Sequence, residues 1–329
     1  MTVLLEILIF VCSLAVTLGA AAFFARRLDG IGLQLGLPET LLGLLTALAA
    51  DAPELASAIA AIVKGDHDAG VGVVIGSNVF NLAAMIGLTA LLAGHVRVRR
   101  EAVAFEGAVA LGVAVAAAAV IVGILEPAAG LAIIALVFVP YLVVLAAGPE
   151  RVGRRSLGAP GRFLRRSFGA EHRRDAPRHG EASLRPALLL LPAVAIVVVG
   201  ATGMVEAALR LSDRAGVPSY VTGVLVLAVL TSLPNAFTAV RLGLHGRGSA
   251  VLSETLNSNT INLIAGFAVP ATLLTLGDFS GVVAVDLVWL LAMTVVALAL
   301  LARPRGVGRV AGAVFVAAFA AFAIVQVVA

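Results

Sequence analysis

The sequence predicts an all-α membrane protein with ten transmembrane helices, arranged as two inverted five-helix repeats with broken helices at the membrane midplane. Three observations support this fold class: an apolar composition, long stretches that are nearly uncharged, and a residue pattern that recurs in the second half. The chain has 329 residues, of which 61% are hydrophobic and 13% are charged, and its mean hydropathy is +1.08. A soluble domain of this length would need more charge to cover its surface.

Ten apolar segments give the expected helices in chain order. Each is long enough to cross the hydrocarbon core of a bilayer, which takes a helix of about 20 residues. They cover roughly 3–25, 38–63, 69–93, 102–123, 127–147, 186–207, 218–242, 250–274, 281–302 and 307–328. We expect the first to be a membrane span rather than a cleaved signal peptide, because no basic region precedes it and it ends in Arg26 and Arg27. The single cysteine, Cys12, excludes an intramolecular disulfide framework and a cysteine-based metal cluster.

One long hydrophilic segment, 148–185, separates a first half (1–147) from a second half (186–329) and contains ten arginines. Its Arg, Gly and Pro content predicts a cytoplasmic linker that is at least partly disordered. The alternative is an amphipathic surface helix around 161–168 that binds anionic lipid.

The basic residues predict the orientation in the membrane. If the N-terminus is outside, 20 of the 23 Lys and Arg residues fall at inner helix ends, and only Lys64, Arg210 and Arg214 fall outside. This distribution follows the positive-inside rule. We therefore expect both termini outside the cell membrane and the linker in the cytoplasm. The basic pI near 10.2 then reflects membrane orientation and does not indicate a nucleic-acid partner.

An internal repeat relates the two halves at an offset near 180 residues. The matched positions are Gly36–Pro38 with Gly216–Pro218, Gly43 with Gly223, Pro53 with Pro234, Gly65 with Gly246, and 76–81 with 257–262. The repeats extend over about 36–93 and 216–274. Because equivalent segments lie five spans apart, they must cross the bilayer in opposite directions, which is the inverted repeat of many secondary transporters.

Polar residues gather where the repeat predicts broken helices. Pro53 and Pro234 lie mid-span, where proline removes a backbone hydrogen bond and opens the helix. Backbone carbonyls freed at membrane depth are tolerated only where protein buries them or where they line a water-filled cavity. The polar residues beside the two prolines and in the spans that follow are Asp51, Glu54, Ser77, Asn78, Asn81, Thr231, Ser232, Asn235, Ser258, Asn259 and Asn262.

These side chains predict a cation site. Carboxylate, amide, hydroxyl and carbonyl oxygens are the ligands that hard cations prefer, and no His or Cys lies in the four repeat spans. Two carboxylates at the bilayer centre require a compensating cation or proton. The alternative is that the polar residues only hold helices together, an interpretation that stays open for Ser77 and Ser258 taken singly.

The residues resemble the calcium/cation antiporter superfamily, whose best-known branch is the sodium/calcium exchangers. Each repeat of that family carries a Gly-Thr-Ser-x-Pro-Glu signature and a Gly-Ser-Asn-x-x-Asn-like signature. The second signature is present here in both halves, as GSNVFN at 76–81 and NSNTIN at 257–262. The resemblance covers both repeats and implies an antiporter without a cofactor, in which two glutamates face each other across a calcium site flanked by sodium sites.

The first signature is altered in both repeats. Residues 49–54 keep Glu54 but place Ala50 and Asp51 where the family has Thr-Ser, whereas residues 230–235 keep Thr-Ser but place Asn235 where the second glutamate belongs. Both carboxylates therefore come from one repeat. The loss of a facing carboxylate is expected to weaken calcium binding, and two close carboxylates can share a proton because like charges disfavour double ionisation.

The function expected from this pattern is antiport of Ca²⁺ or a related cation against Na⁺ or H⁺, by alternating access through the lipid bilayer. The first alternative is a proton-coupled antiporter of Na⁺ or K⁺. A second, from another class, is an ion sensor or scaffold that does not transport. An enzyme is disfavoured because the sequence shows no nucleophile–base pair, phosphate loop or His-rich metal motif.

Three further sets of polar residues have simpler roles as alternatives. We expect Glu6 and Glu206 to pair locally near a membrane interface rather than to act in transport. Glu254, one helical turn before Ser258, is a candidate for the inner vestibule. The cluster 66–68 is expected to be a solvated outer loop rather than a metal site.

Overall fold

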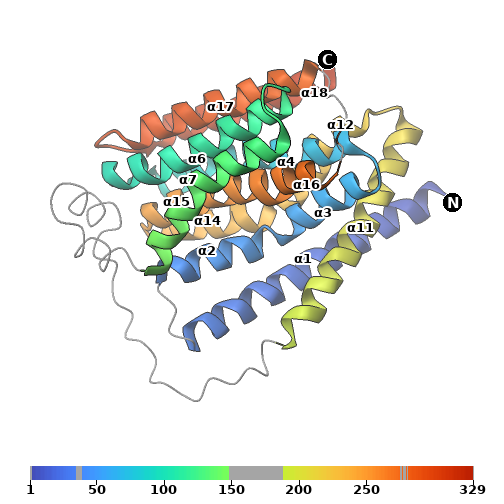
Figure 1. Cartoon of the computed structure of the whole chain (residues 1–329), viewed down its shortest axis with the longest axis horizontal. Coiled ribbons are helices and arrows are strands. Elements are labelled where there is room, and N and C mark those ends of the chain that lie inside the picture. Colours follow the sequence, from blue (N-terminus) through green and yellow to red (C-terminus); the bar gives the residue numbers. More distant parts are fainter. Residues whose placement is uncertain are drawn as a thin grey trace.

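The apolar segments fold as helices throughout the computed structural model, which describes residues 2–34, 39–147, 188–274, 276, 279 and 281–328. In the first half the elements are α1 (Val3–Gln34), α2 (Glu39–Ala50), α3 (Ala52–Val63), α4 (His67–Asn81), η1 (Leu82–Leu88), α5 (Thr89–Ala93), β1 (His95–Val96), α6 (Arg100–Ile121) and α7 (Pro127–Ala147). In the second half they are α11 (Leu190–Ala215), α12 (Ser219–Val221), η2 (Thr222–Leu227), α13 (Ala228–Thr231), α14 (Leu233–Leu244), α15 (Gly248–Ile261), η3 (Asn262–Ala268), α16 (Val269–Leu273), α17 (Gly281–Leu301), β2 (Val307–Gly308) and α18 (Arg309–Val328). The helices run roughly side by side, and the two ends of the chain lie toward the same end of the bundle (Figure 1).

Seven helices among the described residues are long and apolar enough to cross a membrane, and a bent pair over Ser219–Leu244 is an eighth candidate. This confirms the prediction of an all-α membrane protein. The predicted spans 38–63 and 250–274 are not among the candidates. The first is divided into two helices of 12 residues, α2 and α3, and the second carries the polar residues of the repeat signature, which lower its apolar content.

Both repeats contain a helix broken next to a proline, as predicted. Helix α2 ends before Asp51 and α3 begins after it, with Pro53 in the first turn of α3. Likewise α13 ends before Ser232 and α14 begins after it, with Pro234 in the first turn of α14 and a bend of 46° between the two parts. Proline fits a first helical turn because the N–H it lacks has no helical partner there.

Three π-helical segments widen the helices around these breaks. Segment η1 follows Asn81 and segment η3 begins at Asn262, so the two occupy equivalent places after the Ser-Asn-x-x-Asn signatures. Segment η2 precedes the break at Ser232. Single π-turns inside α-helices occur frequently at functional sites. The repeat seen in the sequence is therefore also a repeat of helix irregularities.

Close helix packing at two glycines brings the repeats together. A Cβ atom at Gly76 of α4 would lie 2.3 Å from the Val224 carbonyl oxygen, and one at Gly223 of η2 would lie 2.3 Å from the Ala69 carbonyl oxygen. Small residues permit this approach of transmembrane backbones. Helix α4 of the first repeat is thus fixed against η2 of the second, next to both breaks.

Replacing Gly76 with alanine is expected to destabilise the protein by about 1–3 kcal/mol, because the added methyl group meets backbone atoms that cannot move aside. The measurement is thermal unfolding of the purified protein in detergent, together with its monodisperse yield. Gly19→Ala is the matched control, since a Cβ atom at Gly19 of α1 meets nothing within 4 Å. Equal stability of the two variants would contradict the packing argument.

Helices α1 and α11, the first of each half, pack along one another at one side of the molecule (Figure 1). Gly200 of α11 faces Thr17 of α1, and Glu6 of α1 forms an ion pair with Arg214 of α11 at 3.0 Å. Helix α11 also packs against α3. The predicted linker 148–185 and the matched segment Gly36–Pro38 lie outside the described residues.

Candidate cation-binding site

Two carboxylates lie buried together at the break between α2 and α3. Asp51 occupies the break and is 0% exposed, while Glu54 lies in the first turn of α3 and is 1% exposed. Carboxylates are almost never buried to this extent without a partner. Their hydrogen-bond partners in the described part of the chain are amides and hydroxyls, so the negative charge of the site has no cationic side chain bonded to it.

Asn235 of α14 lies between the two carboxylates. Its Nδ2 atom donates to Asp51 Oδ1 at 2.7 Å and to Glu54 Oε1 at 2.9 Å, and Ser258 Oγ lies 3.3 Å away. The amide nitrogen must face the carboxylates because both are acceptors. A residue of the second repeat therefore bridges both acidic groups of the first repeat, at a place where a cation could also bind.

Helices α15 and η3 supply the next donors to the carboxylates. The Ser258 hydroxyl donates to Asp51 Oδ1 at 2.6 Å, and Asn262 Nδ2 donates to Glu54 Oε2. Asn262 Nδ2 also approaches Ser77 Oγ, and in the opposite direction Asn81 Nδ2 donates to Ser258 Oγ at 3.0 Å. The two signature motifs thus contact each other directly, as the repeat predicts, and the second of them also contacts the carboxylates.

Asn78 and Asn259 form a reciprocal pair between α4 and α15. Asn78 Nδ2 donates to the Asn259 carbonyl oxygen at 3.1 Å, and Asn259 Nδ2 donates to the Asn78 carbonyl oxygen at 3.1 Å. These bonds join equivalent residues 181 positions apart and satisfy backbone carbonyls inside the membrane. The geometry gives both amide nitrogens a role in holding the repeats together.

Four buried oxygen atoms around the carboxylates have no hydrogen-bond donor among the described residues: Asp51 Oδ2, Asn81 Oδ1, Asn262 Oδ1 and Ser232 Oγ. The Ser232 hydroxyl approaches Glu54 without a well-formed hydrogen bond. A buried acceptor left without a partner is destabilising by about 1–3 kcal/mol. Each of these four atoms is an oxygen of the kind that a hard cation accepts as a ligand.

All eleven residues predicted for the site are buried, with 0–7% of each exposed. Ten of them lie in the network described above. Thr231 differs, because its Oγ1 donates to the Leu227 carbonyl oxygen of its own helix at 2.7 Å. The Ser77 hydroxyl likewise donates to Val74 within α4, at 3.1 Å. These two hydroxyls can contribute lone pairs to an ion, while their protons are used within the helix.

Glu254 and Asp286 are further acids that lie outside the predicted site. Glu254 of α15 has a buried Oε2 atom without a partner, and the charges acting on it come from Asp51 and Arg247. Asp286 of α17, 1% exposed, accepts hydrogen bonds from Tyr220 Oη and Gln326 Nε2, both at 2.6 Å. Asp286 was missed because it has no counterpart in the repeat. The signal that could have identified Asp286 is the presence of an acidic residue inside an apolar span.

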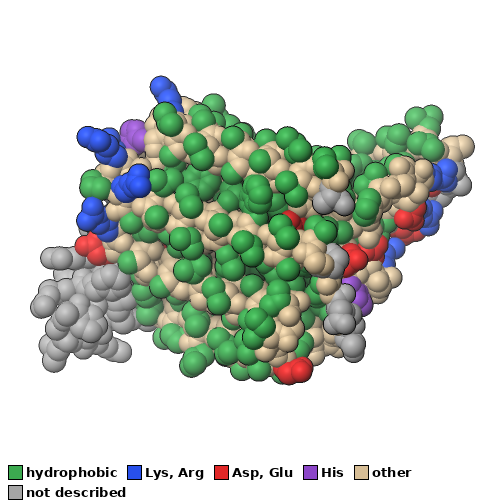
Figure 2. Space-filling view, turned by 90° about the horizontal axis from the view of Figure 1, so that it is seen from above, with side chains coloured by type: hydrophobic (Ala, Val, Ile, Leu, Met, Phe, Trp, Pro, Cys, Tyr) green, Lys and Arg blue, Asp and Glu red, His purple; other side chains and the backbone are tan. Residues whose placement is uncertain are grey.

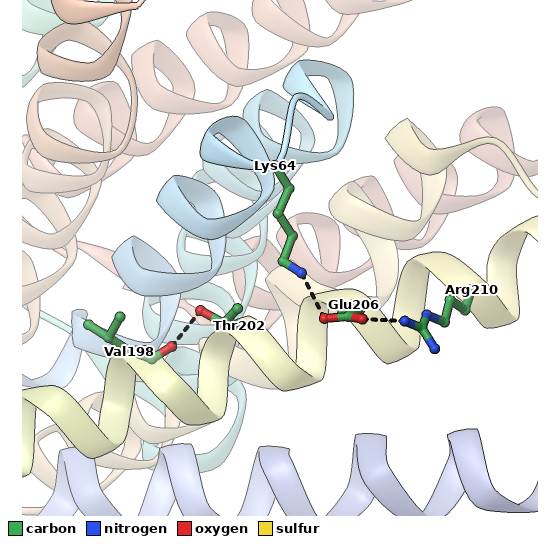
Figure 3. Close-up of polar contacts among 5 residues, drawn as sticks. All are labelled: Lys64, Val198, Thr202, Glu206 and Arg210. Carbon is green, nitrogen blue, oxygen red and sulfur yellow. Dashed lines mark hydrogen bonds and ion pairs between the residues drawn. The ribbon is translucent and has the colours of Figure 1, made fainter. Parts of the chain in front are cut away.

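Glu206 and Glu6 form local ion pairs, as expected. Figure 3 shows Lys64, the residue after α3, reaching Glu206 of α11, with a contact of 2.8 Å, and Arg210 on the other side of the same carboxylate. Glu206 is 43% exposed and Lys64 33% exposed, and exposed pairs of this kind contribute at most about 1 kcal/mol. They link α11 to α3 away from the buried carboxylates.

The cluster at 66–68 has a structural role at its first residue. Asp66 Oδ1 accepts a hydrogen bond from the Ala69 N–H at 3.0 Å and so caps the start of α4. In the described ranges, no group of three or more His, Cys, Asp and Glu residues could hold a metal ion. A cation in the buried network would therefore depend on amide and hydroxyl oxygens beside its two carboxylates.

Comparison with solved structures shows the fold. A structure of the sodium-calcium exchanger NCX_Mj soaked with zero Na⁺ and Ca²⁺ matches with a TM-score of 0.63 at 20% identity, covering 99% of this chain and 100% of the other. A second NCX_Mj structure, soaked with 100 mM Na⁺ and 10 mM Sr²⁺, matches with a TM-score of 0.62, over 98% and 99% of the two chains. The likeness therefore extends across nearly the whole molecule.

Two relatives match in sequence. Inner membrane protein YrbG of Escherichia coli (strain K12) is 28% identical over 248 residues, which are 74% of this chain and 72% of the relative. Sodium/calcium exchanger MaX1 of Methanosarcina acetivorans is 35% identical over 86 residues, which are 26% of this chain and 25% of that protein. The model of the family described as sodium/calcium exchanger protein matches residues 5–147 and 186–328. Because the family model matches both halves, this chain belongs to the sodium/calcium exchanger protein family and is a cation antiporter of that type, not an enzyme.

Proposed function

We propose that the chain exchanges Ca²⁺ or a related cation for Na⁺ or H⁺ by alternating access, using the buried network around Asp51 and Glu54 as its ion site. The observation that carries the proposal is a pair of buried carboxylates with four buried oxygen atoms, one of them Asp51 Oδ2 itself, that have no hydrogen-bond donor among the described residues. Oxygen ligands of this kind suit hard cations. The ions are transported substrates, and the proposal includes no cofactor.

The proposed architecture is ten crossings in two inverted halves, 1–147 and 186–329, joined by a cytoplasmic linker at 148–185. The breaks at Asp51 and Ser232 and the equivalent segments η1 and η3 support a repeat. An even number of crossings is supported by the two chain ends, which lie toward the same end of the bundle (Figure 1).

The proposed location is the cell membrane, with both termini outside. Figure 2 shows mostly Lys and Arg at one end of the molecule, whereas acidic and basic side chains are mixed at the other end. The first end would face the cytoplasm under the positive-inside rule.

Transport would require one part of the protein to move against another. We assign the moving part to α1 and α11, which pack along each other, and the fixed part to the elements around the site. Movement of this pair past α3 and η2 would open the carboxylates to one side of the membrane at a time. The state without a bound ion leaves two uncompensated charges, which disfavours the movement until an ion neutralises the site.

The test is uptake of radioactive calcium into liposomes that contain the purified protein. An outward sodium gradient and a proton gradient are applied in parallel, with protein-free liposomes as the baseline. Uptake driven by either gradient supports the proposal and identifies the coupling ion. Calcium uptake at the baseline under both gradients would exclude calcium as the substrate.

A proton-coupled antiporter of Na⁺ or K⁺ is the second candidate, and the position of Asn235 favours it. The Asn235 amide presents its hydrogens to both carboxylates, so it offers donors on the side where the family has a second glutamate. One proton shared by Asp51 and Glu54 would leave a single charge, which matches a monovalent ion. Sodium- or potassium-driven proton movement in the same liposomes without calcium would select this candidate.

A further inference from the structure

A groove at one end of the bundle combines three arginines with an apolar wall. It is an open space of about 970 Å³ between the end of α17, the loop to α18 and the start of α18. Its basic side chains are Arg303, Arg305 and Arg309, and its apolar lining includes Leu300, Val310 and Val314. The candidate ion site shares none of these residues.

The positive charge of this groove has little compensation within the described part of the protein. Arg303 and Arg305 are exposed, and their side chains form no ion pair or hydrogen bond with a described residue. Arg309 is also exposed, and its Nε donates only to the Leu91 carbonyl oxygen, at 3.3 Å. Among the described residues that line the groove, none is acidic. Three guanidinium groups are therefore available to an anionic ligand.

The backbone beneath the arginines is held in place. Strand β2 (Val307–Gly308) pairs antiparallel with β1 (His95–Val96), and both Val307 and Val96 are buried. Gly306 has a positive φ of 64° and packs so closely on Val96 that a Cβ atom would lie 2.1 Å from the Val96 carbonyl oxygen. The loop that carries Arg305 and leads to Arg309 is thus fixed before any ligand binds, which reduces the entropy lost on binding.

The wall beside the arginines has the character of a lipid-facing helix. Val310 is 82% exposed and Val314 is 59% exposed, and they lie one turn apart on α18. Apolar side chains exposed on a transmembrane helix contact acyl chains. The arginines follow directly where α17 ends, so they lie at the level where phospholipid headgroups meet the hydrocarbon region.

We propose that this groove is a binding site for an anionic phospholipid. Its phosphate would bind the guanidinium groups of Arg303, Arg305 and Arg309, and an acyl chain would lie along Val310 and Val314. Guanidinium groups bind phosphate through paired, charge-assisted hydrogen bonds, and basic pockets between transmembrane helices bind anionic headgroups. The apolar wall favours a lipid over free phosphate, because a free phosphate ion would make no favourable contact with these apolar side chains.

The test is native mass spectrometry of the full-length protein, which counts phosphatidylglycerol molecules that remain bound after release from detergent. Each arginine near an anionic surface contributes about 1 kcal/mol, or roughly fivefold in affinity. The double variant Arg303→Gln/Arg305→Gln should therefore bind the retained lipid roughly 25-fold more weakly. Arg26→Gln/Arg27→Gln removes the same charge from α1, outside the groove, and should retain the lipid as the unmodified protein does.

Further comparisons decide the outcome. Val314→Trp keeps all charges but fills the groove, so it should also lose the retained lipid, while thermal unfolding in phosphatidylcholine checks that each variant is folded. Equal retention by the two arginine double variants would overturn the proposal. Equal retention of phosphatidylcholine by the unmodified protein, or complete displacement of phosphatidylglycerol by excess inorganic phosphate, would overturn it as well. The result does not depend on which ions the protein transports.

Discussion

Replacing Glu54 with glutamine is expected to abolish cation transport while the protein stays folded. Glutamine has nearly the shape of glutamate and keeps a carbonyl acceptor for Asn235 or Asn262, which both donate to Glu54. It removes the charge, however. A carboxylate about 4 Å from a monovalent cation contributes on the order of 4 kcal/mol at an effective dielectric constant near 20, which is nearly a thousandfold in affinity.

The measurement is gradient-driven cation uptake in liposomes, with the monodispersity and thermal stability of each variant recorded in detergent. Glu126→Gln is the matched control, because Glu126 precedes α7 and lies outside the buried network. Its uptake should equal that of the unmodified protein. If Glu54→Gln transports at the rate of this control, the assignment of Glu54 as the central ligand is wrong.

Binding can be separated from transport in the same variants. A cation that binds only the folded protein raises its unfolding temperature, and the rise grows with the logarithm of the cation concentration once that concentration exceeds the dissociation constant. We expect the transported cation to stabilise the unmodified protein and Glu126→Gln but not Glu54→Gln. If the cation still stabilises Glu54→Gln although uptake is lost, Glu54 is needed for the conformational change of transport and not for ion binding.

The sequence was sufficient to predict an all-α membrane protein and the polar residues that lie together around the two carboxylates, because both depend on strong local signals. Apolar length identifies the helices, and the matched prolines identify where two of them break. The repeat then relates residues that are far apart in sequence, such as Asn78 and Asn259, and these do lie against each other. No knowledge of side-chain conformation was needed for these steps.

Side-chain direction could not be predicted in the same way. Thr231 and Asn235 lie on the same stretch of polar residues, yet one bonds back to its own helix and the other bridges both carboxylates. The difference depends on the local turn at Ser232, where the α-helix is interrupted. Asp286 shows a second limit, since its partners come from α12 and α18, and only tertiary packing brings them together.

The double variant Asp51→Ser/Asn235→Glu is expected to increase calcium affinity by tenfold or more. It keeps the formal charge of the site but moves one carboxylate to the second repeat, so that Glu54 is faced by an acid across the site. At present Asn235 directs amide hydrogens at Asp51 and Glu54, at 2.7 and 2.9 Å. A carboxylate there would replace those donors with acceptors, so that carboxylate oxygens from both repeats could bind one calcium ion.

The two single variants separate charge from position. Asp51→Ser removes one charge and should lower calcium affinity, whereas Asn235→Glu adds a third carboxylate to a closed, buried site and should destabilise the protein unless a divalent cation is present. The measurement is the calcium dependence of uptake, with thermal stability recorded with and without calcium. A double variant whose calcium affinity is unchanged would show that Asn235 does not limit divalent binding. Because the formal charge is the same before and after the exchange, a gain in the double variant would mean that the placement of carboxylates on two repeats, and not their number, sets the preference of this site for a divalent ion.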